Sequence, residues 1–257
     1  MKHDFLDHHR EGNSLIHRLD PRLKIVMIVF FILIVLTINY ENRYWFLLYF
    51  VVPLLLAILS EISLLHYLIK LLRLYPMIFF VTLLIPLFPL PDETPYRFWG
   101  ISISSIGLQK FILINTKAVL ILFISIVLTS TTDFMRLLKG LEKFRIPTLV
   151  LAILSFMYRF IFLLIDEMER VVMAYRSRYL HLSLMKKIKV FASMIGLFFI
   201  RTYERGERIY LAMESRGFQG NIYTLTDLRW RMSDSLVAVI FFLTVLVPFI
   251  SMLLKSF

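Results

Sequence analysis

Long apolar stretches alternate with short polar links along this chain, and they predict a bundle of membrane-spanning helices. A helix that crosses about 30 Å of hydrocarbon needs roughly 20 consecutive apolar residues. The stretches that approach this length are Leu23–Asn39, Tyr44–Leu59, Tyr67–Leu90, Ile106–Ser130 and Ser235–Leu254. A short polar link joins the first two, which predicts a tight helical hairpin. The pattern therefore predicts an all-α, polytopic membrane protein with about five transmembrane helices.

The third stretch contains three prolines, Pro76, Pro86 and Pro89. Proline removes a backbone donor and clashes with the preceding helical turn, so we expect these residues to kink or end the third helix.

The pattern changes after the fourth stretch, where apolar and charged residues interleave from Thr131 to Asp234. Two apolar stretches remain there, Thr148–Ile165 and Val190–Ile200, and the second is too short to cross a membrane. Apolar residues that recur every three or four positions predict two amphipathic helices in this region. They cover residues 164–182 and 198–216.

Charge placement predicts how the chain is oriented. It has 29 Lys and Arg against 18 Asp and Glu. Thirteen of these basic residues lie between positions 159 and 231. Basic residues concentrate in cytoplasmic loops. We therefore expect a cytoplasmic N-terminus, a retained first apolar anchor, and a stretch at Thr148–Ile165 that does not cross. The expected domains are an N-terminal membrane domain (1–130), a cytoplasmic helical region (131–233) and a C-terminal transmembrane helix (234–257).

Composition supports the membrane assignment and narrows the chemistry. The chain is 59% hydrophobic, whereas soluble domains are about 45–50% apolar. It contains no cysteine, which excludes disulfides, thiolate metal sites and a cysteine nucleophile. A group of N-terminal histidines and aspartates could bind a metal, although such a group is more commonly an unstructured polar tail. Its members are His3, Asp4, Asp7, His8 and His9.

An arginine at the end of the second amphipathic helix is a candidate contact with another protein. This helix closes with Ser215-Arg216-Gly217, and Gly217 suits the left-handed position that follows a helix end. Arg216 would then lie at an exposed tip, where its guanidinium could make bidentate contacts with an acidic partner. From the residues alone, the alternative is that Arg216 only complements the helix dipole.

A second such arginine lies in Ser177-Arg178-Tyr179, 38 positions earlier (216 minus 178). The pair resembles the X-Arg-X signature of the T component of energy-coupling factor (ECF) transporters, the CbiQ/EcfT family. Other family segments are matched, in order, by Ser14–Lys24, Thr131–Pro147, Tyr158-Arg159-Phe160 and Glu214–Gly220. Together they cover nearly the whole chain. Tyr179 departs from the family's usual glycine, so we expect the first helix to continue past Arg178.

The resemblance implies the transmembrane coupling subunit of an ECF-type ABC importer in the plasma membrane of a prokaryote. The implied partners are two ABC ATPase subunits, a substrate-binding membrane S component and the lipid bilayer. The residues implied to contact the ATPases are Ser177, Arg178, Tyr179, Ser215, Arg216 and Gly217. The S component selects the substrate, which is cobalt, nickel or a vitamin. The family implies no cofactor or resident metal.

Other functions fit the sequence less well. We expect no ATPase activity, because no glycine of this chain opens a phosphate-binding P-loop. An intramembrane enzyme needs ionisable groups that converge at membrane depth, and the candidates there are Asn115, Lys117 and Arg159, with no carboxylate or histidine to complete a site. A stand-alone secondary transporter or channel often has repeated halves, and we find no internal repeat. Nucleic-acid binding would suit the basic charge, but the apolar stretches account for the chain better.

Overall fold

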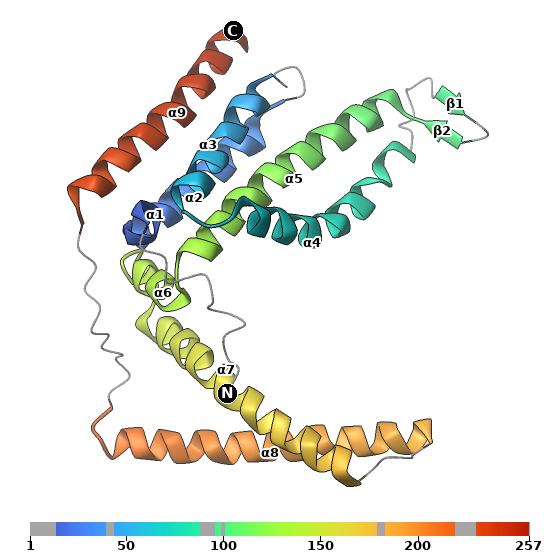
Figure 1. The fold of residues 1–257 in the computed structure, drawn as a ribbon, viewed down its shortest axis with the longest axis vertical. Coiled ribbons are helices and arrows are strands. Elements are labelled where there is room, and N and C mark those ends of the chain that lie inside the picture. Colours follow the sequence, from blue (N-terminus) through green and yellow to red (C-terminus); the bar gives the residue numbers. More distant parts are fainter. Residues whose placement is uncertain are drawn as a thin grey trace. The chain divides into compact units, whose positions relative to one another are not determined.

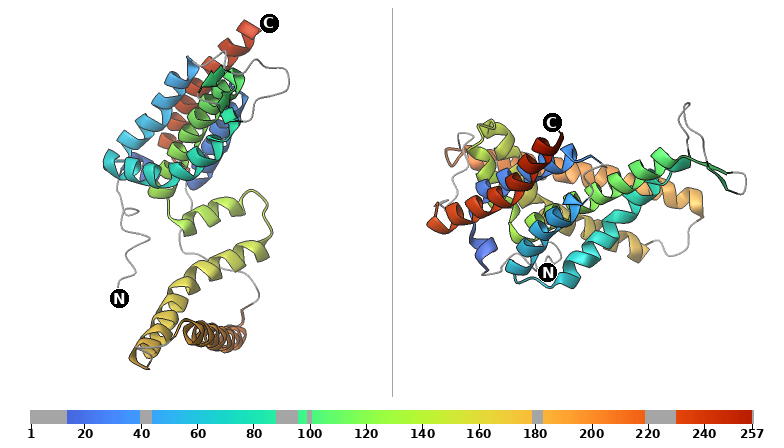
Figure 2. Two further views of the ribbon diagram at one scale, coloured as in Figure 1. Left: turned by 90° about the vertical axis from the view of Figure 1, so that its right-hand side faces the viewer. Right: turned by 90° about the horizontal axis from the view of Figure 1, so that it is seen from above.

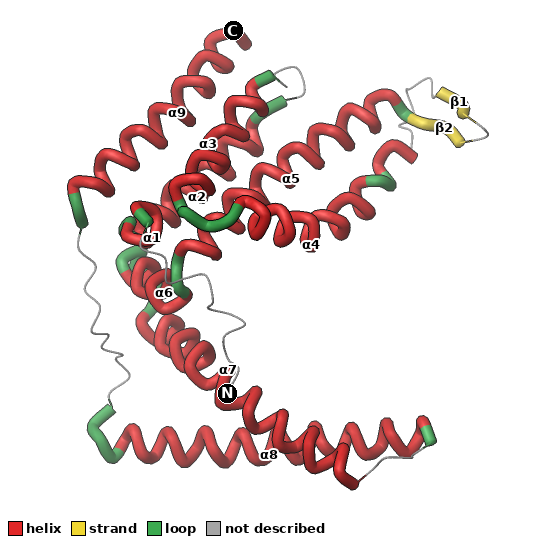
Figure 3. Tube along the Cα trace, viewed as in Figure 1, coloured by secondary structure: helices red, strands yellow, loops and turns green. Residues whose placement is uncertain are grey.

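A computed structural model describes residues 14–39, 44–87, 96–98, 101–178, 183–218 and 230–256 (Figure 1). In these residues the chain is helical apart from one short hairpin, as Figure 3 shows, which confirms the all-α class. The helices are α1 (Leu15–Arg18), α2 (Pro21–Thr37), α3 (Trp45–Leu59), α4 (Leu64–Thr82), α5 (Ser105–Thr131), α6 (Phe134–Glu142), α7 (Thr148–Arg178), α8 (Leu184–Glu214) and α9 (Met232–Ser256). Strands β1 (Tyr96–Phe98) and β2 (Ile101–Ile103) pair antiparallel, and a 3₁₀ turn covers Ile85–Leu87.

The chain divides into two compact units. Residues 2–140 and 228–257 form one unit, which contains α1 to α5, most of α6, and α9. Residues 141–227 form the other unit, which contains α7 and α8. We call them the bundle unit and the crossed-helix unit. The expected three-part division places its boundaries elsewhere and remains a prediction.

Helix α2 begins where its sequence provides a cap. Asp20 is the N-cap residue, and its carboxylate accepts a hydrogen bond from the backbone N–H of Arg22 at 2.9 Å. Pro21 follows at the first helical position, where a missing N–H costs nothing because that group has no partner inside the helix. The segment Asp20-Pro21 therefore fixes the start of α2 and the register of the residues that follow it.

The bundle unit is built around α2. One face of α2 is buried through every turn from Leu23 to Ile38, and Phe31 is fully buried. Around that face lie Phe46, Tyr49 and Val52 of α3, Leu120 and Ile124 of α5, and Phe241 and Val245 of α9. The ring of Tyr49 lies 6.2 Å from that of Phe31. The three views of Figures 1 and 2 show these long helices packed side by side.

Large apolar side chains also cover the outer faces of the bundle helices, among them Leu47, Met77 and Phe80. Exposed apolar surface of this kind suits contact with lipid rather than water. In the described part of the chain, α4, α5, residues Thr148–Ser177 of α7 and residues Met232–Ile250 of α9 are long and apolar enough to cross a membrane. Helix α3 is a shorter apolar helix.

The structure changes several predicted helix bounds. Helix α4 continues through Pro76 and ends at Thr82, and Pro86 lies in the 3₁₀ turn beyond it. Pro89 lies outside the described residues. Helices α7 and α8 have 31 residues each, because the apolar stretches at 148–165 and 190–200 continue without a break into the two predicted amphipathic helices. By length and composition α7 could span a membrane; that residues 148–165 do not cross remains a prediction.

Candidate functional site

Backbone hydrogen bonds at the end of α8 fix the conformation of the helix tip that carries Arg216. The N–H of Gly217 donates to the carbonyl of Glu214 at 2.9 Å, and the N–H of Phe218 donates to that of Met213 at 3.0 Å. These two bonds, with Gly217 at φ +79°, make a Schellman motif, in which a left-handed residue reverses the chain and satisfies the last helical carbonyls. The predicted left-handed position of Gly217 is thus confirmed.

Arg216 is the residue just before this reversal, and it is exposed. Its backbone N–H donates to the carbonyl of Met213 at 3.0 Å. In the described part of the chain, its guanidinium makes no ion pair or hydrogen bond. A planar guanidinium held this way can form two parallel hydrogen bonds with one carboxylate. The exposed tip predicted for Arg216 is therefore present.

The chain beyond the tip returns to α7. The ring of Phe218 packs edge-to-face against that of Phe156, with centroids 5.7 Å apart. Phe156 in turn stacks on Phe160, one helical turn further along α7. Aromatic contacts of this kind stabilise by about 0.5–1.5 kcal/mol beyond simple burial. The tip is therefore held from both sides, by the helix before Gly217 and by the aromatic contact after it.

The first candidate arginine, Arg178, is the last residue of α7. The structure describes its backbone but not its side chain, and Tyr179 lies outside the described residues. Whether the helix continues past Arg178 is therefore untested.

A local feature links the two helix ends. The hydroxyl of Ser177 donates to the carbonyl of Ala174 at 2.9 Å, and that of Ser215 donates to the carbonyl of Ala212 at 3.0 Å. Both serines directly precede the candidate arginines, so each helix ends in the pattern Ala-x-x-Ser-Arg. Sequence reasoning missed this agreement at three positions, although the repeat is visible in the sequence.

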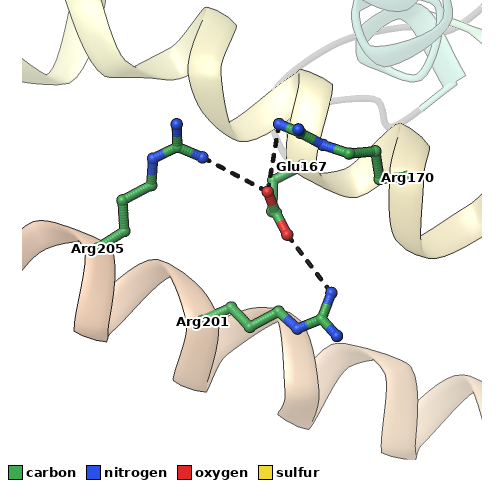
Figure 4. A network of polar contacts seen from close by, with 4 residues as sticks. All are labelled: Glu167, Arg170, Arg201 and Arg205. Carbon is green, nitrogen blue, oxygen red and sulfur yellow. Dashed lines mark hydrogen bonds and ion pairs between the residues drawn. The ribbon is translucent and has the colours of Figure 1, made fainter.

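An ion cluster joins α7 to α8 where the two helices cross (Figure 4). The carboxylate of Glu167 lies 3.3 Å from Arg170 on its own helix, and 3.5 Å from both Arg201 and Arg205 of α8. The Glu167 side chain is only 15% exposed. Sequence reasoning overlooked this cluster. The available signal was the spacing of the two arginines, four positions apart on one helix face.

The ion cluster gives a reference point for the two arginine tips along their helices. Arg178 lies eleven residues beyond Glu167 (178 minus 167), and Arg216 lies eleven residues beyond Arg205 (216 minus 205) and fifteen beyond Arg201 (216 minus 201). At 1.5 Å per residue, the first arm is about 16 Å long and the second about 16–23 Å. Since α8 follows α7 through a short connection and its end returns to Phe156, the helices run in opposite directions. The crossed-helix unit therefore carries its tips on two arms that extend from one crossing.

No group of histidine or acidic residues in the described part of the chain is arranged to hold a metal ion. The N-terminal group at residues 3–9 lies outside the described residues, so its candidate metal site is untested.

Comparison with known proteins matches residues 12–225 to the CbiQ family, described as "Cobalt transport protein". Among curated relatives, the energy-coupling factor transporter transmembrane protein EcfT of Lactococcus lactis is 31% identical over 93% of this chain and 94% of its own length. The EcfT proteins of Streptococcus equi and Listeria innocua are each 32% identical, over 89% and 93% of this chain and 89% and 94% of their own lengths.

These matches confirm the resemblance drawn from the arginine motifs, and the family is one of multi-pass membrane proteins. They also confirm the expectation of a transporter subunit rather than an enzyme, because the matched proteins are transmembrane components. The chain belongs to the CbiQ/EcfT family of energy-coupling factor transporter transmembrane proteins.

Proposed function

We propose that this chain couples two ABC ATPase subunits, identical or paralogous, to a substrate-binding membrane S component in an ECF-type importer. The observation that carries the proposal is the pair of matching Ser-Arg helix ends on the two arms of the crossed-helix unit. Arg216 is the better defined of the two, because a left-handed Gly217 and the Phe218 contact hold its backbone in place. Two equivalent tips suit two ATPase subunits.

In this proposal each arginine tip enters an acidic groove on one ATPase subunit. ATP binding closes the ATPase pair and draws the two tips together. Because Glu167 joins the helices at their crossing, displacement of the tips moves both helices together. Such a movement requires that the ATPases bind the tips with different free energies in their open and closed states, since equal affinity shifts no equilibrium.

The crossed-helix unit also offers a surface to the S component. Large apolar side chains are exposed along both helices, among them Leu149 and Met157 of α7 and Met185 and Phe199 of α8. An apolar surface of this extent on charged helices marks a protein or membrane contact. We assign it to the S component, whose reorientation in the membrane would follow the movement of α7 and α8.

The proposal requires that residues 131–233 lie in the cytoplasm with the N-terminus. The density of basic residues in this segment supports that orientation. Because the chain lacks cysteine, a single Phe218→Cys substitution beside Gly217 gives one thiol for labelling. We expect a membrane-impermeant maleimide to label it only after the cells are opened. Labelling from outside intact cells would exclude the proposed orientation.

The transported substrate is set by the S component. The family description names cobalt, which we propose first, with nickel and vitamins as the alternatives. The experiment that tests the function is purification of the tagged chain from its native membrane, followed by mass spectrometry of the proteins that accompany it. We expect two ATPase subunits and one small membrane protein. Recovery of the chain alone, with uptake by it in liposomes, would favour a stand-alone transporter.

A further inference from the structure

Two lysines in the bundle unit each contact the end of a neighbouring helix. Lys24, near the start of α2, donates from Nζ to the carbonyl of Thr131 at 3.0 Å, at the end of α5. Lys117 of α5 donates from Nζ to the carbonyl of Leu36 at 2.7 Å, near the end of α2. Helices α2 and α5 are therefore antiparallel neighbours, and each supplies a cation to the other's C-terminal carbonyls.

Both contacts have the same physical basis. The last four carbonyls of a helix have no partner within the helix, and they carry the negative end of its dipole. In a membrane, an unsatisfied carbonyl costs several kcal/mol because water is absent. Lys24 and Lys117 thus make chemically matched contacts at opposite ends of one helix pair.

The surroundings of the two contacts differ. The Lys24 side chain is buried, at 5% exposure, and Nζ also donates to the hydroxyl of Thr132 at 2.8 Å. Asp234, at 1% exposure near the start of α9, and Arg136 of α6 act electrostatically on Lys24. The Lys117 contact is exposed and involves one carbonyl. Lys24 therefore joins α2 to the segment that leads into α6. The charged groups that act on it are Arg136 of α6 and Asp234 of α9.

Helix α6 meets the start of α2 a second time. A Cβ built on Gly140 would lie 3.3 Å from the side chain of Ile25, 3.4 Å from the backbone nitrogen of Arg22 and 3.5 Å from the carbonyl carbon of Pro21. Thr131 and Thr132, which lie just before α6, and Gly140, near its end, are thus all close to the first turns of α2. By chain connection, α6 is the last helix before α7 and its arginine arm.

We propose that Lys24 is a positioning residue for coupling, because its bonds to Thr131 and Thr132 hold α6 on α2 so that movement of α7 reaches the bundle. This inference rests on the proposed function. Lys117 makes the same kind of bond at the other end of α2, away from α6, and contributes stability alone. The two lysines therefore form a matched test pair.

The first test measures ATP hydrolysis and uptake by the complete complex in liposomes, probed with radiolabelled cobalt, nickel and B vitamins. For Lys24→Met we expect uptake per ATP hydrolysed to fall by about tenfold or more, since losing a buried bond to a charged group shifts a two-state equilibrium by at least that factor. Lys24→Arg should recover part of the loss. Thr132→Val removes one acceptor and preserves the shape of the side chain. Its uptake per ATP hydrolysed should lie between the values of wild type and Lys24→Met. Lys117→Met should keep the wild-type ratio.

The second test needs no substrate. Spin labels at Arg18→Cys and Glu142→Cys, both exposed positions, report the distance from α1 to the end of α6 in this cysteine-free chain. We expect a narrow distance distribution in wild type and in Lys117→Met, and a broad one in Lys24→Met. This measurement can also be made on the chain alone in nanodiscs, so it tests the Lys24 contact even if no ATPase binds.

Two outcomes would overturn the inference. One is an unchanged uptake ratio with a narrow distance distribution in Lys24→Met, which would make Lys24 a stabilising residue only. The other is an equal loss of coupling in Lys117→Met, which would show that any loosening of the helix pair has the same effect. Failure of the wild-type chain to bind ATPases would instead remove the proposed function and leave the spin-label result standing.

Discussion

Glu167 of α7 and Arg201 of α8 form an ion pair at 3.5 Å where the two helices cross. Arg205 lies at the same distance from the other carboxylate oxygen, and Arg170 lies at 3.3 Å. One largely buried carboxylate therefore serves three guanidinium groups, two of them from the opposite helix. These ion pairs connect the two helices at their crossing, which is where we expect a movement of one helix to reach the other.

Removing the carboxylate should loosen the crossing. Glu167→Gln leaves three guanidinium groups facing one another, and we expect a loss of about 1.5–3 kcal/mol in the stability of the helix pair, the range for a hydrogen bond to a charged group. The loss should appear as faster proteolysis within residues 141–227 and a lower melting temperature of the purified chain.

The matched control for that substitution is Glu169→Gln, since Glu169 is exposed on the same helix. It makes no ion pair within the described part of the chain. We expect a change below about 0.5 kcal/mol, as is usual for exposed positions. Equal effects of the two substitutions would show that the crossing does not depend on Glu167.

Gly217 should be sensitive to any side chain, because its φ of +79° lies in the left-handed region. Gly217→Ala should cost about 1–2 kcal/mol at the helix end and displace Arg216. Gly206, in the middle of α8, also has open space around it, but its helical backbone accepts a side chain. Gly206→Ala should stabilise the helix by about 0.5–1 kcal/mol. Retention of ATPase subunits by the tagged chain measures both effects, and tighter or unchanged retention in Gly217→Ala would contradict the tip geometry.

A lysine at position 216 should not replace the arginine. Lysine keeps the charge but lacks the planar fork that makes bidentate contacts, so we expect Arg216→Lys to weaken ATPase binding by about tenfold, or 1.4 kcal/mol. Arg208→Lys is the control, because Arg208 is an exposed arginine of the same helix with a long 4.0 Å ion pair to Glu204. Titration of purified ATPase subunits against each variant in detergent gives the affinities. If Arg216→Lys bound the ATPase subunits with wild-type affinity, the tip would act through its positive charge alone and not through bidentate contacts.

The aromatic contact beyond the tip should restrict the motion of the tip without taking part in ATPase binding itself. Phe218→Leu removes the edge-to-face contact with Phe156, which is worth about 0.5–1.5 kcal/mol. We expect a spin label at position 216 to become more mobile while membrane insertion is unchanged. Phe144→Leu, at an exposed phenylalanine between α6 and α7, should leave that label unaffected.

The sequence was most informative where one residue determines local geometry. Gly217 could be assigned a left-handed conformation because few other residues adopt it, and Asp20-Pro21 marks a helix start for a similar reason. The helix bounds of α7 and α8 were harder to predict. Their apolar and charged stretches differ in composition, and periodicity alone does not show that a helix continues from one into the other.

Long-range polar contacts were the least predictable feature. Lys24 and Thr131 are separated by 107 positions, and nothing in a local pattern connects them. Lys117 bonds to the carbonyl of Leu36, 81 positions away, and no local pattern connects these two residues either. Glu167 was overlooked because two of its three partners lie on another helix. Pairings of this kind depend on which helices become neighbours, and a single sequence does not contain that information.

The most direct test of the coupling account is retention of ATPase subunits by the affinity-tagged chain, compared between wild type and the double variant Arg178→Ala with Arg216→Ala. The account predicts that the double variant inserts into the membrane at normal levels, keeps its S component and loses both ATPase subunits, together with all uptake. A double variant that retains both ATPase subunits and transports at the wild-type rate would contradict it.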